Sequence, residues 1–234
     1  MTQLGALIFD FDGTIADSEP LHLAAFQRTF ADECGLELIE ADYKAHYLAF
    51  DDQMMITTFL ADRGMELPPG RFEQLLRIKE SYYEVLAADP PILPGVVALV
   101  RAASARWPLA VASGALEPEI RPVLEDAGLI GHFQTIVSAE MVERGKPDPE
   151  SFLTALARIN EKREEKIPPS GALVFEDSIP GVSSGRAAGM RVLAITNSFP
   201  REQLTEADRV VDSLEEIADT EALASWFASL PNCP

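Results

Sequence analysis

Short apolar runs that end in polar turns alternate along most of this chain with segments of helical periodicity. The first run, Ala6–Phe9, meets a turn that holds two aspartates and a glycine. Runs of the same kind follow at residues 109–112, 135–137, 172–175 and 192–195. Strands that alternate with helices of ordinary length are typical of βαβ units. The sequence therefore predicts an α/β fold with a Rossmann-like parallel sheet core flanked by helices.

The block between the first strand and the rest of the sheet has a different pattern. The helices expected between the strands are 95–106, 118–127, 149–160 and 181–188. Residues 17–89 contain no convincing strand and instead carry helical patterns at 22–31, 41–48, 53–63 and 71–87. We therefore expect two domains. Residues 1–16 and 90–234 would form an α/β core domain, and residues 17–89 would form a small helical domain inserted into it.

The linkers between these domains are expected near residues 16–18 and in the proline-rich segment 89–95. A chain that crosses twice between two domains suggests a hinge, and the two crossing segments would then lie close together in space.

The charge balance of the chain limits its partners. Lys and Arg number 19 against 38 Asp and Glu, which gives a net charge of −19. Such an acidic surface repels nucleic acid and anionic lipid, and no apolar run reaches the ~18 residues of a membrane span. The start of the chain has no basic segment or cleavage site of a secretion signal. We expect a cytoplasmic monomer with no nucleic-acid or membrane partner, in which Cys34 and Cys233 are free thiols.

Polar residues follow four of the predicted strands at the ends where parallel strands meet. Because doubly wound sheets bind ligands at this edge, we expect these residues to form one site. They are Asp10 and Asp12 after the first strand, Ser113 and Gly114 after the second, Lys146 in the loop beyond the third, and Glu176 and Asp177 after the fourth.

The four carboxylates in this group indicate a bound cation. Without one, their mutual repulsion would strongly raise their pKa values, and hard oxygen ligands of this kind suit Mg²⁺. Asp10 or Asp12 could attack phosphorus while the other moves a proton. The Ser113 hydroxyl with nearby backbone N–H groups could hold phosphate oxygens. Each residue also has a simpler interpretation: acids that cap helices, a common Ser-Gly turn, and a lysine that is surface charge.

Taken in order, these segments resemble the four motifs of the haloacid dehalogenase-like superfamily. They are DFDGT at 10–14, VASG at 111–114, GKPDP at 145–149 and VFEDS at 174–178. The helical insert resembles the cap of that superfamily. The segment DSEPLH at 17–22 is similar to the entry to the cap in the branch that contains β-phosphoglucomutase and phosphoglycolate phosphatase.

The resemblance implies roles for the site residues. Asp10 would be the nucleophile and Asp12 the general acid and base. Asp10, the carbonyl of Asp12, and Asp177 would hold Mg²⁺, with Glu176 close by or ligating through water. Ser113 and Lys146 would bind the transferred phosphoryl group, with Gly114 beside them. An acid at the position of Asp12 favours phosphate esters over halogenated acids or phosphonates, because an alkoxide leaving group needs a proton.

The cap departs from the mutases of this branch. Asp52 stands where β-phosphoglucomutase has an arginine for the distal phosphate, and an acid there would repel that phosphate. Lys79 and His22 do match a lysine and a histidine of the mutase, which makes them candidate substrate-binding residues. Each has a second interpretation, Lys79 as an exposed helix charge and His22 as part of the hinge.

The function expected from these observations is a Mg²⁺-dependent phosphatase that hydrolyses a small phosphorylated metabolite, similar to a sugar phosphate, through an aspartyl-phosphate. Two alternatives stay open. One is a β-phosphoglucomutase-like transfer of the phosphoryl group between sugar hydroxyls, and the other is a non-catalytic binding module on the same fold.

Overall fold

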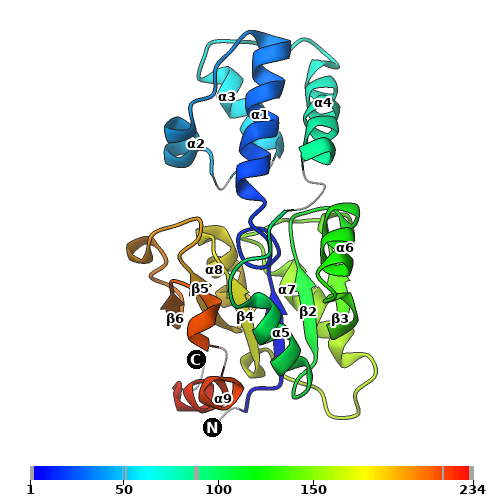
Figure 1. The fold of residues 1–234 in the computed structure, drawn as a ribbon, viewed down its shortest axis with the longest axis vertical. Helices are drawn as coiled ribbons and strands as arrows, with labels where there is room; N and C mark the ends of the chain where they lie inside the picture. Colours follow the sequence, from blue (N-terminus) through cyan, green and yellow to red (C-terminus); the bar gives the residue numbers. More distant parts are fainter. Residues whose placement is uncertain (1–2, 49, 51, 87–89, 218, 232–234) are drawn as a thin grey trace. The chain divides into compact units, whose positions relative to one another are not determined.

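The computed structural model describes residues 3–48, 50, 52–86, 90–217 and 219–231. The chain divides into two compact units (Figure 1). Met1–Asp17 and Pro91–Pro234 form one unit, which we call the sheet unit, and Ser18–Pro90 form the other, which we call the helical unit. The expected linker residue Asp89 and the expected helix end Ala87 lie outside the described residues.

The sheet unit is built on six parallel strands in the order β3-β2-β1-β4-β5-β6, counted over the described residues. The strands are β1 (Ala6–Phe9), β2 (Leu109–Ala112), β3 (Phe133–Val137), β4 (Ala172–Glu176), β5 (Arg191–Ile195) and β6 (Arg209–Val211). The first strand lies in the middle of the sheet, where Ile8 is level with Ala110 on one side and Val174 on the other. The predicted parallel sheet is confirmed.

Helices cover both faces of this sheet (Figure 1). Successive side chains of a strand point to opposite faces. Leu7 and Phe9 therefore pack with α5 (Val96–Ser104), α6 (Glu117–Asp126) and α9 (Thr220–Ser229). Ala6 and Ile8 pack with α7 (Glu150–Asn160) and α8 (Ile179–Ala187). Because both faces are covered, the central strands are apolar throughout, as in other parallel sheets.

Several element boundaries differ from the sequence-based expectation. The sequence pattern predicts no helix or strand beyond residue 195, yet this part of the chain forms β6 and α9. Helix α8 begins at Ile179 rather than at residue 181, because the Ser178 side chain caps it by accepting a hydrogen bond from Gly181 N. Short 3-10 turns fill several connections: η1 (Ile130–His132), η2 (Ala139–Met141), η3 (Pro169–Gly171), η4 (Arg201–Gln203) and η5 (Leu214–Ile217).

The helical unit has its own apolar core. Its helices are α1 (Glu19–Cys34), α2 (Glu40–His46), α3 (Asp52–Ala61) and α4 (Arg71–Leu86). Buried aromatic and aliphatic side chains from these helices form one cluster, which includes Phe26, Phe30, Phe59 and Leu75. Helix α1 begins three residues before the expected start. Its proline lies in the first turn, where the missing N–H removes no helical hydrogen bond.

The two segments that connect the units are paired where they leave the sheet unit. Leu93 N donates to Ile15 O at 2.9 Å, and Asp17 N donates to Pro91 O at 2.9 Å. Ala16 and Ile92 form an antiparallel bridge between these hydrogen bonds. The outgoing and returning chains therefore run side by side in this part of the sheet unit.

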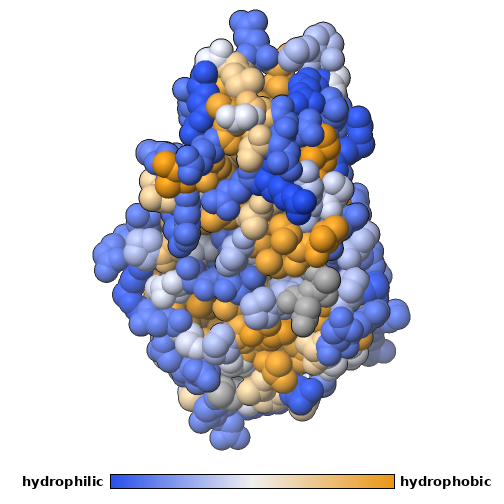
Figure 2. All heavy atoms as spheres, turned by 45° about the horizontal axis from the view of Figure 1, so that its top comes forward, coloured by the Kyte–Doolittle hydropathy of each residue, from blue (hydrophilic) through white to orange (hydrophobic). Residues whose placement is uncertain are grey.

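Across the described residues, no helix combines the length and the apolar character that a membrane crossing requires. Hydrophilic residues make up much of the face in Figure 2, with apolar residues in smaller groups between them. Cys34 is a free thiol, as expected, whereas Cys233 lies outside the described residues.

Candidate active site

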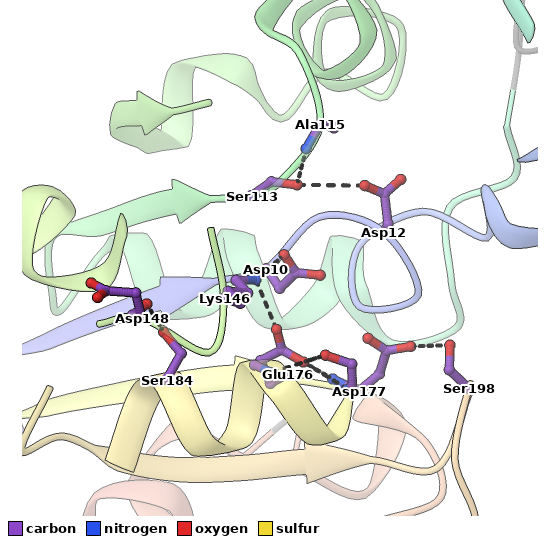
Figure 3. A network of polar contacts seen from close by, with 12 residues as sticks. Asp10, Asp12, Ser113, Ala115, Lys146, Asp148, Glu176, Asp177, Ser184 and Ser198 are labelled. Atoms are coloured by element: carbon purple, nitrogen blue, oxygen red, sulfur yellow. Dashed lines mark hydrogen bonds and ion pairs between the residues drawn. The ribbon is translucent and has the colours of Figure 1, made fainter. Parts of the chain in front are cut away.

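The end of β1 carries the first two acidic residues of the candidate site (Figure 3). Asp10 continues the strand, since its N–H donates to Phe175 O at 2.9 Å, and it is buried. Gly13, with φ of 72°, then turns the chain, and its N–H donates to Ala16 O at 2.8 Å. This turn keeps Asp12 at the same edge of the sheet as Asp10.

Lys146 lies between two of the acids rather than on the surface. Its Nζ forms ion pairs with Asp10 Oδ1 and, at 2.7 Å, with Glu176 Oε1. The loop that carries it is fixed at Asp148, whose side chain accepts from Glu150 N at 3.1 Å and whose carbonyl accepts from Ser184 Oγ at 2.7 Å. The peptide bond that follows Lys146 is cis. The interpretation of Lys146 as surface charge is therefore wrong.

Glu176 and Asp177 complete an acidic group at the end of β4. One carboxylate oxygen from each of Asp10, Glu176 and Asp177 lies within 4.8 Å of those of the other two, and all three residues are buried. Figure 3 shows these side chains beside one another, with Lys146 above Glu176. The expected convergence of acids from separate strands is thus present, with a lysine among them.

The electrostatics of this group are unbalanced without a further cation. Burial raises the pKa of Asp10 to about 7; Lys146 opposes this effect, while Glu176 and Asp12 add to it. Burial alone would lower the pKa of Lys146, but Asp10 and Glu176 outweigh burial and raise it well above its usual value. One ammonium group faces three buried carboxylates, so the donor set fits a divalent cation that prefers oxygen ligands.

Ser113 faces the other side of the β1 turn. Its Oγ donates to Asp12 Oδ2 at 3.4 Å and accepts from Ala115 N at 3.0 Å. Its backbone N–H donates to Val137 O at 3.0 Å, which ties it to the end of β3. Gly114 is exposed beside it, and a Cβ there would meet nothing within 4 Å. The residue that follows β2 therefore places its hydroxyl within hydrogen-bond distance of Asp12.

Two serines that the sequence interpretation missed contact the acidic group. Ser198 Oγ donates to Asp177 Oδ2 from the loop that follows β5, and Ser178 Oγ donates to Glu176 Oε2 at 2.9 Å. A signal for Ser198 was present, because it comes shortly after the carboxyl end of a predicted strand. Ser198 thus shares with the other site residues a position shortly after the end of a predicted strand.

The candidate cap residues form a separate cluster inside the helical unit. Lys79 is only 1% exposed, and its Nζ donates to both Asp52 carboxylate oxygens, at 2.8 and 2.6 Å, and to His22 Nδ1 at 2.9 Å. The ring of His22 stacks on Tyr83 with centroids 4.1 Å apart. The interpretation of Lys79 as an exposed helix charge is wrong. The neighbouring cap-loop residues Ala49 and Asp51 lie outside the described residues.

Burial lowers the pKa of His22 well below its usual value, and the nearby Lys79 ammonium lowers it further. A neutral imidazole follows, and its Nδ1 lone pair accepts from Lys79. The single ring proton of this neutral imidazole is then on Nε2.

Comparison with known proteins identifies the family. Residues 7–195 match the family model of haloacid dehalogenase-like hydrolases. The chain belongs to this family. The resemblance drawn from the four motifs is confirmed.

Relatives and solved structures of this hydrolase family extend over nearly the whole chain. Protein CbbY of Cereibacter sphaeroides is 30% identical over 223 residues, which cover 91% of this chain and 93% of the relative. Hexitol phosphatase A of Escherichia coli is 32% identical, covering 91% and 93% of the two chains. The crystal structure of CbbY from Rhodobacter sphaeroides in complex with phosphate has a TM-score of 0.80 at 28% identity, covering 95% of this chain and 99% of that one.

Proposed function

We propose that this hydrolase is a Mg²⁺-dependent phosphatase that acts on a small, sugar-like phosphorylated metabolite. The observation that carries this proposal is the group at the strand ends. Asp10, Glu176 and Asp177 supply clustered oxygen ligands, Lys146 supplies positive charge, and Asp12 lies beside a hydroxyl. Phosphoryl transfer needs a nucleophile, a proton donor and neutralisation of phosphoryl charge, and these residues offer all three.

The named relatives support the same substrate class. Hexitol phosphatase A and, at 32% identity over 79% of this chain, fructose-1-phosphate phosphatase YqaB of Escherichia coli are sugar-phosphate phosphatases by name. A variant of CbbY, at 27% identity and a TM-score of 0.80, was solved in complex with xylulose-(1,5)bisphosphate. A phosphorylated sugar or sugar alcohol is therefore the substrate class to test first.

In the proposed reaction Asp10 attacks phosphorus through a carboxylate oxygen. The bond between phosphorus and the leaving oxygen breaks, and Asp12 gives its proton to that oxygen. Asp12 then takes a proton from water, which attacks the phosphorus of the aspartyl-phosphate. The bond from phosphorus to Asp10 breaks, and phosphate and free enzyme result. Asp12 ends the cycle protonated, ready for the next leaving group.

The remaining residues hold the phosphoryl group and the cation. Asp10, the backbone carbonyl of Asp12, and Asp177 would ligate Mg²⁺, and Glu176 would ligate it directly or through water. The bound ion supplies charge neutralisation for the phosphoryl oxygens. Lys146 and Ser113 would bind those oxygens from the adjacent strand ends, with Gly114 beside them. Ser113 also orients Asp12 through its hydrogen bond.

The helical unit is proposed to be the cap domain that selects the leaving group, with His22 and Lys79 as its polar determinants. The alternative of a sugar-phosphate mutase requires the cap to hold a second phosphate. Asp52 forms an ion pair with Lys79, so this pair brings no net positive charge for such a phosphate. The pairing supports hydrolysis over mutase chemistry. We also propose that the enzyme is a cytoplasmic monomer, which light scattering and cell fractionation test.

The deciding experiment is phosphate release from a panel of phosphorylated sugars and sugar alcohols, with and without Mg²⁺. Asp10→Asn should abolish turnover, because the amide is a poor nucleophile. Asp126→Asn, the same change at an exposed acid at the end of α6, should leave turnover unchanged. The panel includes β-glucose 1-phosphate, with glucose 6-phosphate monitored. Isomerisation without phosphate release would establish the mutase instead, and absence of turnover on the whole panel would favour a binding module.

A further inference from the structure

The carboxylate of Glu176 accepts three hydrogen bonds from residues at the start of α8. Its Oε2 accepts from Asp177 N at 2.8 Å, from Ser178 N at 2.7 Å and from Ser178 Oγ at 2.9 Å. Its Oε1 accepts from Lys146 Nζ at 2.7 Å. Four donors thus fix one buried side chain, and the direction of the carboxylate is set by the backbone of the β4–α8 turn.

The carboxylate of Glu176 also fills the place where a side chain at residue 181 would begin. A Cβ added to Gly181 would lie 1.6 Å from Glu176 Oε1 and 2.4 Å from Oε2. Both distances are far inside van der Waals contact. Any residue larger than glycine at this position of α8 forces the carboxylate out of its site.

The Asp177 carboxylate likewise lies where a side chain at Gly13 would begin. A Cβ at Gly13 would lie 1.9 Å from Asp177 Oδ2. Position 13 also has a positive φ, which favours glycine. A substitution there would therefore combine backbone strain with the clash against Asp177. Gly181 has no positive φ and lies within a helix, where alanine is otherwise the better residue. Position 181 therefore isolates the steric effect on the carboxylate.

We propose that Gly181 is a positioning residue of the active site, which acts by leaving the space that the Glu176 carboxylate occupies. This inference rests on the proposed function. Displacement of the carboxylate removes one of the two acceptors that hold Lys146 and takes an oxygen out of the group that would surround Mg²⁺. Residues that orient a metal group from outside typically change metal affinity by about 10–100-fold when altered. A loss of that size is expected for Gly181→Ala.

The test is Mg²⁺ binding by titration calorimetry in the absence of substrate, with thermal unfolding of each variant. Gly181→Ala should weaken Mg²⁺ binding about 10–100-fold. The matched control is Gly185→Ala, one turn further along α8, where a Cβ would press on Val192 Cγ2 at 2.8 Å and on no carboxylate. The control should lower the melting temperature and leave Mg²⁺ affinity unchanged. Wild-type affinity in Gly181→Ala overturns the inference.

Shortening Glu176 separates the steric effect from a general loss of helix packing. In the Glu176→Asp background the side chain is one methylene shorter, so its carboxylate lies further from residue 181. Gly181→Ala should then reduce Mg²⁺ affinity by a smaller factor than it does in the wild type. Equal costs in the two backgrounds contradict the inference. Should Gly181→Ala not fold, folding of Glu176→Ala/Gly181→Ala supports the clash with Glu176, and failure of both to fold overturns it.

These outcomes are distinct from failure of the proposed function. Absence of Mg²⁺ binding by the wild-type protein would refute the proposed metal dependence. Equal binding by the wild type and Gly181→Ala would refute only the role of Gly181.

Discussion

At the end of β1, Asp10 shares a buried space with two other carboxylates and one lysine. Burial and its acidic neighbours raise its pKa to about 7, although Lys146 opposes them. A carboxylate with this pKa is partly protonated near neutral pH, and a proton on Asp10 would block the proposed nucleophilic attack and metal ligation. The proposed cation and the proton would therefore compete for Asp10.

This competition makes the stabilising effect of Mg²⁺ dependent on pH. Because the pKa of Asp10 rises on folding, its contribution to stability is fully present below pH 3.8 and is lost as the pH rises through about 7. Mg²⁺ binds the ionised form, so its effect should grow over the same interval. At pH 8 and 100 times its dissociation constant, Mg²⁺ should stabilise the protein by about 2.7 kcal/mol, or roughly 5–10 °C in melting temperature. At pH 5 and the same Mg²⁺ concentration, the shift in melting temperature should be clearly smaller when measured by scanning calorimetry. Equal shifts at the two pH values would contradict this account.

The contribution of Asp12 to kcat/KM should increase with the basicity of the leaving oxygen. Asp12→Asn should reduce kcat/KM on sugar phosphates by about 10²–10⁴-fold, because general acid catalysis contributes that much. On p-nitrophenyl phosphate, whose leaving group is a stable anion, the loss in the first step should be much smaller. Burst kinetics separate that step from hydrolysis of the aspartyl-phosphate. A uniform loss on both substrates would argue against Asp12 as the acid.

The four acids were predictable because each lies at or just after the end of an apolar strand. The sequence alone did not indicate that Lys146 lies between Asp10 and Glu176 rather than in solvent. It also did not reveal Ser198 or the space at Gly181, since these depend on how a loop and a helix return to the same edge. Chain neighbours could be inferred, but contacts between distant segments required the fold.

Within the helical unit, one buried ammonium group links three helices. Lys79 on α4 contacts His22 on α1 and Asp52 on α3, and its Nζ lies 5.0 Å from the ring centre of Phe26. The apolar faces of these helices alone would bring them together, but the polar cluster adds a specific register among them.

Breaking this cluster should destabilise the helical unit. Lys79→Met removes the partner of a half-buried carboxylate and should cost about 1–3 kcal/mol, less than the 3–5 kcal/mol of a fully buried pair. The control is Lys44→Met, which breaks an exposed pair with Glu40 and should cost less than about 0.5 kcal/mol. Urea unfolding followed by the tyrosine signal measures both changes. Similar costs for the two variants would contradict a structural role for the cluster.

Elements with strong periodicity were predictable, and those without it were not. The central strands are buried on both faces, which gives them unbroken apolar runs. Strand β6 has three residues at the edge of the sheet, and no run of that length is distinctive. Helix α9 begins at a good N-cap, Asp219, which accepts from Glu221 N and Ala222 N, but the segment lies outside the βαβ rhythm.

For the whole molecule, the tyrosines and tryptophans divide between the two units. All four tyrosines lie within residues 18–90, and both tryptophans, Trp107 and Trp226, lie in the sheet unit. Tyrosine near-UV signals therefore report the helical unit, and tryptophan fluorescence reports the sheet unit, without added labels.

These signals should separate in acid when metal is absent. The pKa of His22 is lowered on folding, so the stability it contributes is present above pH 6.5 and is lost as the pH falls further, by at most about 1.4 kcal/mol per pH unit. Over the same range Asp10 acts in the opposite direction on the sheet unit. At pH 5 the tyrosine transition should precede the tryptophan transition. His22→Gln should reduce the separation, and coincident transitions from pH 5 to 8 would refute the prediction.

The central position of β1 has a consequence for how the protein is made. This strand is translated before both of its neighbours, one of which begins at residue 109 and the other at residue 172. The helical unit, in contrast, is complete once residue 90 has been translated. During synthesis the inserted unit can fold first, while the apolar β1 segment waits unpaired and exposed to chaperones or to aggregation. Asp10, the proposed nucleophile, is thus translated well before the fourth strand, and its site is complete only when that strand has been made.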